Sequence, residues 1–137
     1  MKIHPHTLID RGCWISDDRT NAFLSWESSS IAEIGYHGAQ PVSRNSRVFA
    51  GDAGVCSFWI RHPAGEEERL VFGDVEWMPG YARLCGMYSG GSVDIEITTA
   101  GQSLIVVFSR IPSPADAVVV CFHVRALFSK VHGDRSW

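Results

Sequence analysis

The chain has 137 residues, of which 45% are hydrophobic and 20% charged, and its formal net charge at pH 7 is −3. A nucleic-acid-binding domain should carry a basic stripe, and here the arginines and lysines are scattered, so no nucleic-acid partner is expected. No segment approaches the roughly 18 consecutive apolar residues of a membrane-spanning helix, so no membrane association is expected. The length fits one domain.

The N-terminal segment contains the most metal-like pair, His4 and His6. Two imidazoles two residues apart on a strand point to the same side, but the residues that follow lack the glutamate that a β-barrel metal site would supply. We therefore predict no metal and no cofactor. The segment also lacks the long apolar stretch and small-residue cleavage site of a signal peptide, so a cytoplasmic protein is the expectation.

Short strands follow one another through the first two thirds of the chain. The turn-forming sequence at residues 17–20 lies between two strand-like segments and predicts a hairpin. Near residues 28–33, a short helix is the alternative to a strand. The predicted strands in this part are residues 13–16, 21–26, 31–36, 47–50, 54–62, 69–77 and 82–88.

The most regular pattern comes next. Residues 93–98 alternate between apolar and polar side chains, which is typical of a half-buried antiparallel strand. A Gly-containing turn leads to a strand over residues 102–111, whose stretch from Leu104 to Phe108 is apolar on both faces. We predict that this stretch lies centrally and is covered on both sides. The last predicted strand covers residues 117–131.

Turn signals at intervals of about 8–12 residues between β-branched and aromatic strands indicate a sandwich or a barrel. We predict an all-β fold, an antiparallel two-sheet β-sandwich formed by residues 1–137 as a single domain. A closed antiparallel β-barrel is the alternative.

The chemistry-bearing residues give no catalytic signature. The four cysteines, Cys13, Cys56, Cys85 and Cys121, are far apart and include no Cys-x-x-Cys pair, so zinc-ribbon and thioredoxin-like sites are excluded and reduced, buried thiols are expected. The sequence contains no Gly-x-Ser-x-Gly, phosphate-loop or dinucleotide-binding motif. We predict no catalytic residue, and the chain is not expected to be an enzyme.

One polar, aromatic segment, residues 36–47, interrupts the strand rhythm, and long loops often carry function. Its side chains combine a ring with planar hydrogen-bonding groups, which suits sugars or small polar ligands. Trp26 and Trp137, which lie beside a loop or the terminus, are predicted to expose their rings, whereas Trp59 and Trp77 are predicted to be buried. The alternative is an ordered crossover between the sheets. The predicted ligand-binding residues are Trp26, Tyr36, His37, Gln40, Arg44 and Asn45.

Three segments together, residues 18–26, 35–47 and 54–60, resemble the N-terminal β-sandwich of glycogen-debranching-like (amylo-α-1,6-glucosidase-type) proteins. The closing residues 131–137 are similar to the point where that sandwich leads into the next domain. In that family the catalytic carboxylates lie in a helical toroid that is absent from this sequence. The resemblance therefore implies a non-catalytic module and carries over no catalytic residue.

We expect a non-catalytic β-sandwich accessory or binding module, with an association with carbohydrate-active proteins as its candidate context. The alternative is a small β-barrel that binds or acts on a small molecule in its interior, which an interior lined by His37, His62 or His123 would favour. Long apolar strands and bare sheet edges promote association. The expected partners are therefore a second copy of the chain or a protein partner domain, with carbohydrate as a further candidate.

Overall fold

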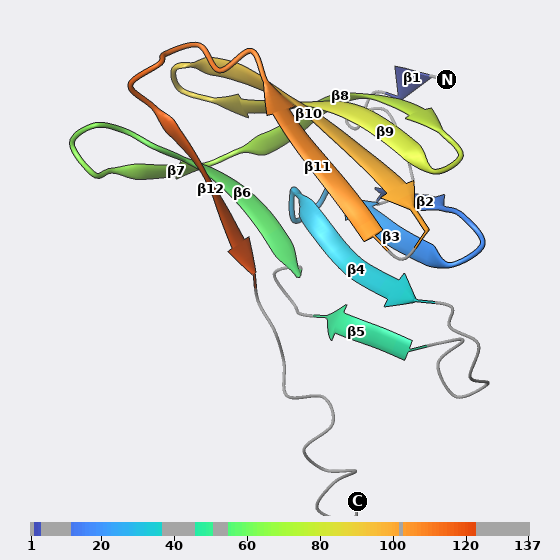
Figure 1. Ribbon diagram of the computed structural model, residues 1–137. Helices are drawn as coiled ribbons and strands as arrows, with labels where there is room; N and C mark the ends of the chain where they lie inside the picture. The colour runs from blue at the N-terminus through green and yellow to red at the C-terminus, as the bar shows by residue number, and fades with distance from the viewer. Residues whose placement is uncertain (1, 4–11, 37–45, 51–54, 102, 123–137) are drawn as a thin grey trace, which may run out of the picture.

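The computed structural model describes residues 2–3, 12–36, 46–50, 55–101 and 103–122, and these residues form two antiparallel sheets and no helix. The sheets face one another as the layers of a β-sandwich (Figure 1). The predicted all-β, two-sheet fold is confirmed, and the sheets do not close into the alternative barrel. No helix in the described part of the chain is long and apolar enough to cross a membrane.

The five-stranded sheet has the order β1-β8-β9-β10-β11. Its last four strands are consecutive in the chain and form hairpins, with the pairing of β10 and β11 extending from Asp94–Ser109 to Ala100–Ser103. The strands are β1 (Lys2–Ile3), β8 (Val71–Met78), β9 (Tyr81–Tyr88), β10 (Gly91–Ala100) and β11 (Ser103–Ser109).

The seven-stranded sheet has the order β12-β6-β4-β3-β2, while β5 pairs with β4 and β7 pairs with β6. The predicted hairpin around residues 17–20 is confirmed as β2 and β3. The strands are β2 (Gly12–Ser16), β3 (Thr20–Ser25), β4 (Ser30–Tyr36), β5 (Ser46–Ala50), β6 (Cys56–Arg61), β7 (Glu67–Arg69) and β12 (Ala117–Phe122).

The hydrophobic core lies between the two sheets. The predicted inward residues of β10, Val93, Ile95 and Ile97, are fully buried. The ring of Phe58 in β6 packs against that of Phe72 in β8, with centroids 6.2 Å apart, and so joins the layers. Each buried side chain of this size contributes about 1.5–3 kcal/mol to folding, which makes this interface the main source of stability.

The predicted strand 69–77 is two strands in different sheets. Leu70 is fully buried between them, and its backbone N–H donates to the carbonyl of Phe58 at 2.8 Å. Here the chain leaves β7 and enters β8 in the opposite sheet. An apolar residue at such a change of sheet continues the strand-like pattern, so the sequence gives no sign of the break.

The prediction that Leu104–Phe108 is a central strand covered on both sides is wrong. β11 is the edge strand of its sheet, and Ile105 and Val107 on its outer face are 47% and 49% exposed. Leu104, Val106 and Phe108 pack against the core. Apolar residues on both faces therefore mark an edge strand whose outer face has no covering element among the described residues.

The alternative of a short helix at residues 28–33 is also wrong. A turn ends at Ser29, whose φ of 48° is left-handed, and β4 begins at Ser30. The Ser29 hydroxyl accepts a hydrogen bond from the backbone N–H of Phe72 at 3.0 Å, so this turn is tied to the opposite sheet. The last predicted strand is described as far as Phe122, and residues 123–131 lie outside the described residues.

Candidate functional site

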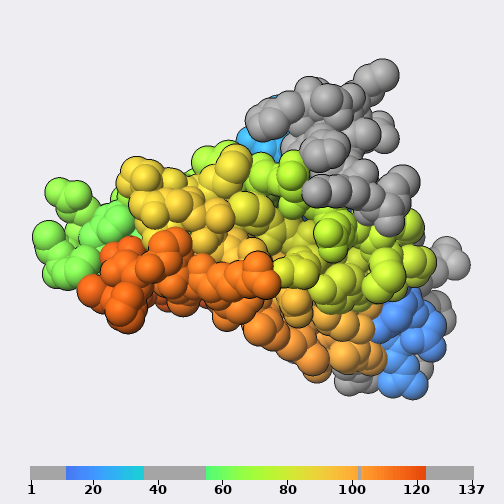
Figure 2. Space-filling model, turned by 90° about the horizontal axis from the view of Figure 1, so that it is seen from above, coloured from blue at the N-terminus to red at the C-terminus, as the bar shows by residue number. Residues whose placement is uncertain are grey.

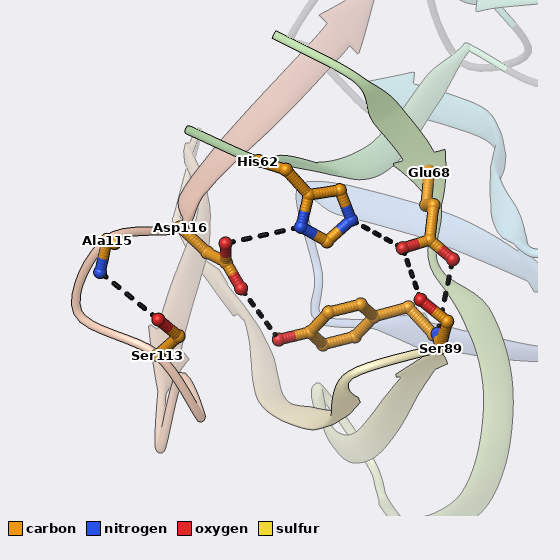
Figure 3. Close-up of polar contacts among 7 residues, drawn as sticks. His62, Glu68, Ser89, Ser113, Ala115 and Asp116 are labelled. Atoms are coloured by element: carbon orange, nitrogen blue, oxygen red, sulfur yellow. Dashed lines mark hydrogen bonds and ion pairs between the residues drawn. The ribbon is translucent and has the colours of Figure 1, made fainter. Parts of the chain in front are cut away.

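A cluster of polar side chains joins three connections at one end of the sandwich (Figure 3). His62 follows β6, and its ring lies between two carboxylates: Nε2 is 2.5 Å from Glu68 Oε2 and Nδ1 is 3.2 Å from Asp116 Oδ1. Glu68 belongs to β7 in the same hairpin. Asp116 comes from the crossover, residues 110–116, which leads from β11 to β12. Two distant segments of the chain thus meet at one imidazole.

The second layer of the cluster comes from the β9–β10 hairpin of the five-stranded sheet. The hydroxyl of Tyr88 donates to Asp116 Oδ2 at 3.2 Å. The hydroxyl and backbone N–H of Ser89 donate to the Glu68 carboxylate at 2.6 and 3.2 Å. The five residues His62, Glu68, Tyr88, Ser89 and Asp116, called the histidine clamp below, therefore tie the two sheets together.

The electrostatics of the clamp favour a charged histidine. The hydrogen bond to Glu68, followed by the hydrogen bond to Asp116 and the charges of both carboxylates, raises the pKa of His62 above its usual value. The hydrogen bonds from Ser89 and from His62 lower the pKa of Glu68. The two shifts describe the same ion pair and agree in sign.

Both ring nitrogens of the clamp histidine are engaged by carboxylates. A general base needs a free nitrogen within hydrogen-bond reach of the proton that it takes, and both ring nitrogens of His62 already face carboxylates. The Ser89 hydroxyl donates to the same Glu68 oxygen that His62 Nε2 contacts, so the base beside Ser89 is the Glu68 carboxylate and not the histidine. Among the described residues, no group of three or more His, Cys, Asp or Glu side chains could hold a metal ion.

An apolar pocket lies between the edge strands of the two sheets. Its volume is about 440 Å³, within the range of roughly 300–1,000 Å³ that ligand sites occupy. β11 lines one wall, and β12, β6 and β4 line the other. Phe122 and Val120 of β12 are 62% and 39% exposed, so this wall reaches solvent. The lining residues are Ile31, Ile34, Cys56, Phe58, Leu104, Val106, Phe108, Val120 and Phe122.

The described lining of the pocket includes one thiol. Cys56 is the single sulfur of its lining, and desolvation by burial, with a smaller effect of Cys121, raises the pKa of its thiol to about 12. A thiol with this pKa is protonated at neutral pH, and the thiolate is the nucleophilic form. The described lining of the pocket is therefore apolar and uncharged at neutral pH.

Of the six predicted ligand-binding residues, the structure describes Trp26 and the backbone of Tyr36. Trp26, predicted to be exposed, is half-buried and packs against the core, and its indole Nε1 is buried without a hydrogen-bond partner. Tyr36 is the last residue of β4. His37, Gln40, Arg44 and Asn45, like His4, His6 and His123, lie outside the described residues.

Among the described tryptophans, the exposed one is Trp14. Its side chain is 47% exposed, on the outer face of the seven-stranded sheet, with its ring centroid 5.1 Å from that of its cross-strand partner Phe23. Trp59 and Trp77, predicted to be buried, are half-buried. The alternation of Trp14 with the buried Ile15 is the signal in the sequence that distinguishes an outward ring from an inward one.

The sequence does not predict the clamp or the pocket. Glu68 ends a run of three glutamates, a pattern typical of a solvated loop, but it lies in β7 and binds His62 and Ser89. Asp116 lies 54 residues from His62, so no local pattern could pair them. The pocket depends on which strands form the sheet edges, which the sequence predicted incorrectly.

No family model, curated protein or solved structure matches this chain. The function therefore follows from the geometry of the described residues. Two features of that geometry stand out: the preformed apolar pocket and the histidine clamp.

Proposed function

We propose that this chain is a non-catalytic β-sandwich binding module that takes the alkyl chain of an apolar ligand into the pocket between β11 and β12. The observation that carries the proposal is the lining itself: a volume of about 440 Å³ lined by aliphatic and aromatic side chains and one thiol, and open to solvent on one side. Binding sites for small molecules are mostly apolar, concave and preformed. The pocket meets each of these conditions.

The chemistry of the lining selects an alkyl chain over a polar ligand. Burying a polar group without a hydrogen-bond partner costs about 1–3 kcal/mol, and none of the described lining residues carries an oxygen or nitrogen on its side chain. Each buried methylene contributes about 0.8 kcal/mol in favour of binding. A hydrocarbon chain is therefore retained and a sugar is rejected at this site.

The strands that form the walls support a pocket that exists before the ligand arrives. The ring of Phe58 packs edge-on against that of Phe108, with centroids 5.2 Å apart, and closes the inner end between the sheets. β12 pairs with β6 from Ala117–Arg61 to Phe122–Cys56, which holds the outer wall. A preformed site avoids part of the entropy cost of binding.

The test is the fluorescence of N-phenyl-1-naphthylamine, an apolar probe, titrated with the chain. We expect saturable binding at one site per chain, displaced by a long-chain alkanol. Val106→Trp should fill the pocket and abolish probe binding. The matched control is Val107→Trp, because Val107 is the neighbouring residue on the outer face of the same strand and is 49% exposed.

The proposal predicts that Val107→Trp binds the probe as the parent chain does. Equal binding by both variants would mean that the probe sits elsewhere, and absence of binding by the parent chain would overturn the proposal. Circular dichroism of both variants verifies that the sandwich is intact.

A carbohydrate-related accessory role, as implied by the resemblance to glycogen-debranching-like proteins, is a second proposal. Trp14 supports it, because sugars stack on exposed aromatic rings and this ring is 47% exposed. A glycan panel tests it: binding that is lost in Trp14→Ala and kept in Trp26→Ala is expected. A panel without any binding would remove this proposal.

A cytoplasmic location and self-association are further proposals. All four cysteines are free thiols, which fits a reducing compartment. The exposed apolar side chains of the two edge strands, Ile105, Val107, Val120 and Phe122, favour association. Light scattering across micromolar concentrations should give at least a dimer mass, and a monomer mass at all concentrations would exclude self-association.

A further inference from the structure

The histidine clamp holds the connection that leads into one wall of the pocket. Asp116 is the residue immediately before β12, and its backbone N–H closes a turn onto Ser113 at 3.1 Å. Its carboxylate is only 9% exposed. In Figure 2, the orange-red crossover lies beside the green β6–β7 hairpin and the yellow β9–β10 hairpin at one end of the molecule. The clamp thus fixes the point where β12 starts.

The protonation state of His62 decides whether both of its ring nitrogens can donate a hydrogen bond to a carboxylate. With His62 protonated, each ring nitrogen donates to its own carboxylate, and Tyr88 and Ser89 supply the remaining donors. A neutral imidazole has a single N–H. One of the two carboxylates then loses its histidine donor and faces a lone pair. The shorter contact, at 2.5 Å, is to Glu68, so we expect the 3.2 Å contact to Asp116 to be lost.

Among the residues that the structure describes, no basic side chain compensates for the lost proton. The charged groups that act on His62 are Glu68 from β7 and Asp116 from the crossover, and the ring of Tyr88 from β9 lies with its centroid 6.1 Å away. Two carboxylates flank the ring, so removing the positive charge also leaves their mutual repulsion unscreened. Both effects act on Asp116 in the same direction.

We propose that the histidine clamp is a pH-operated hold on the start of β12, which is closed when His62 is protonated and releases the crossover and the outer wall of the pocket when His62 loses its proton. The effect on the pocket rests on the proposed function, whereas the release of β12 does not.

The direction of the pH dependence follows from the charge balance. Because the pKa of His62 is raised in the folded chain, the hold is complete below the ordinary histidine pKa of about 6.5. It is lost as the pH rises through the higher folded value. Glu68 has a lowered pKa, so its contribution is lost only in acid, as the pH falls through that lowered value.

The experiment measures two quantities as the pH is varied, in the parent chain and in Asp116→Asn. Amide hydrogen exchange gives the protection factors of β12, and NMR gives the titration curve of the His62 ring. In the parent chain, we expect a His62 midpoint above 6.5 and a loss of protection at β12 with the same midpoint. In Asp116→Asn, the midpoint should move down and the protection of β12 should no longer follow it. Arg61→Gln, which removes an exposed ion pair with Glu67 in the same hairpin, is the matched control and should behave as the parent chain.

Each outcome decides one part of the proposal. Protection of β12 that stays constant while His62 titrates would overturn the clamp. Probe affinity should fall as protection falls, and if it does not, the clamp stands and its effect on the pocket is refuted. If the probe does not bind at any pH, the proposed function fails while hydrogen exchange still tests the clamp.

Discussion

The two sheets meet differently at the histidine clamp and beside the pocket. At the clamp, polar side chains from three connections form directional contacts between the layers. At the pocket, the edge strands β11 and β12 belong to different sheets and leave an apolar space of about 440 Å³ between them. The same crossover connects both regions, because it leaves β11 and enters β12 (Figure 1).

This contrast indicates which part of the fold can change its contacts while the core stays folded. Apolar burial is non-directional and scales with area, so the core tolerates the opening at its edge. Hydrogen-bonded contacts depend on geometry and on protonation, so the clamp responds to pH. The core therefore provides most of the stability, and the pH-dependent change in contacts is expected at the histidine clamp, which holds the crossover.

The largest expected effect is on the core beside the pocket. Phe58→Ala should destabilise the chain by about 3–5 kcal/mol, because Phe58 is fully buried and packs on rings of both β8 and β11. Denaturant unfolding gives the value. Phe122→Ala, at a side chain 62% exposed, should stay within roughly 0.5 kcal/mol. Equal losses would mean that the pocket wall, and not the core, joins the sheets.

An intermediate effect is expected at a polar tie outside the clamp. Ser29→Ala should cost about 1–3 kcal/mol, because it leaves the buried N–H of Phe72 without its acceptor. Ser103→Ala, at an exposed position on β11, is the control for chemical denaturation. An unchanged midpoint for Ser29→Ala would show that water replaces the hydroxyl and that this tie does not join the layers.

A pH effect of opposite sign is expected at the β2–β3 turn. The backbone N–H groups of Thr20 and Arg19 donate to Asp17 Oδ1 and lower the pKa of its carboxyl. This contribution is present above the ordinary aspartate pKa of about 3.9 and is lost as the pH falls through the lowered folded value. Asp17→Ala should lower Tm at neutral pH and flatten its decline in acid. A decline as steep as that of the parent chain would contradict this assignment.

The smallest effect is expected for the exposed neighbour of the clamp. Arg61→Gln removes a pair with Glu67 at 2.9 Å whose side chains are 53% and 39% exposed, and such pairs contribute about 0–1 kcal/mol. The free energy of unfolding should therefore remain close to that of the parent chain at every pH. A pH-dependent loss would mean that Arg61 belongs to the clamp.

The sequence predicted the fold where a local pattern decides it. The alternation of residues 93–98 gave the buried face of β10, and the turn at residues 17–20 gave the first hairpin. Position within a sheet is not local: the stretch from Leu104 to Phe108 reads as a central strand but lies at an edge. Trp26 shows the same limit, because a residue beside a turn can still fold inward onto the core.

The sites could not be predicted for a related reason. His62 and Asp116 meet only because the crossover returns beside the β6–β7 hairpin, and the pocket exists only because β11 and β12 are both sheet edges. Both sites are consequences of topology. The predicted loop site rests on the polar and aromatic composition of residues 36–47. Four of its six residues lie outside the described residues.

The most direct test of the proposed pocket is an NMR methyl titration with a long-chain alkanol. We predict shifts at the methyls of Ile31, Leu104, Val106 and Val120, which line the pocket. The methyls of Ile105 and Val107, on the opposite face of the same strand, should remain unshifted. Shifts on both faces of β11, or none at saturating alkanol, would contradict an alkyl-binding pocket between the two sheets.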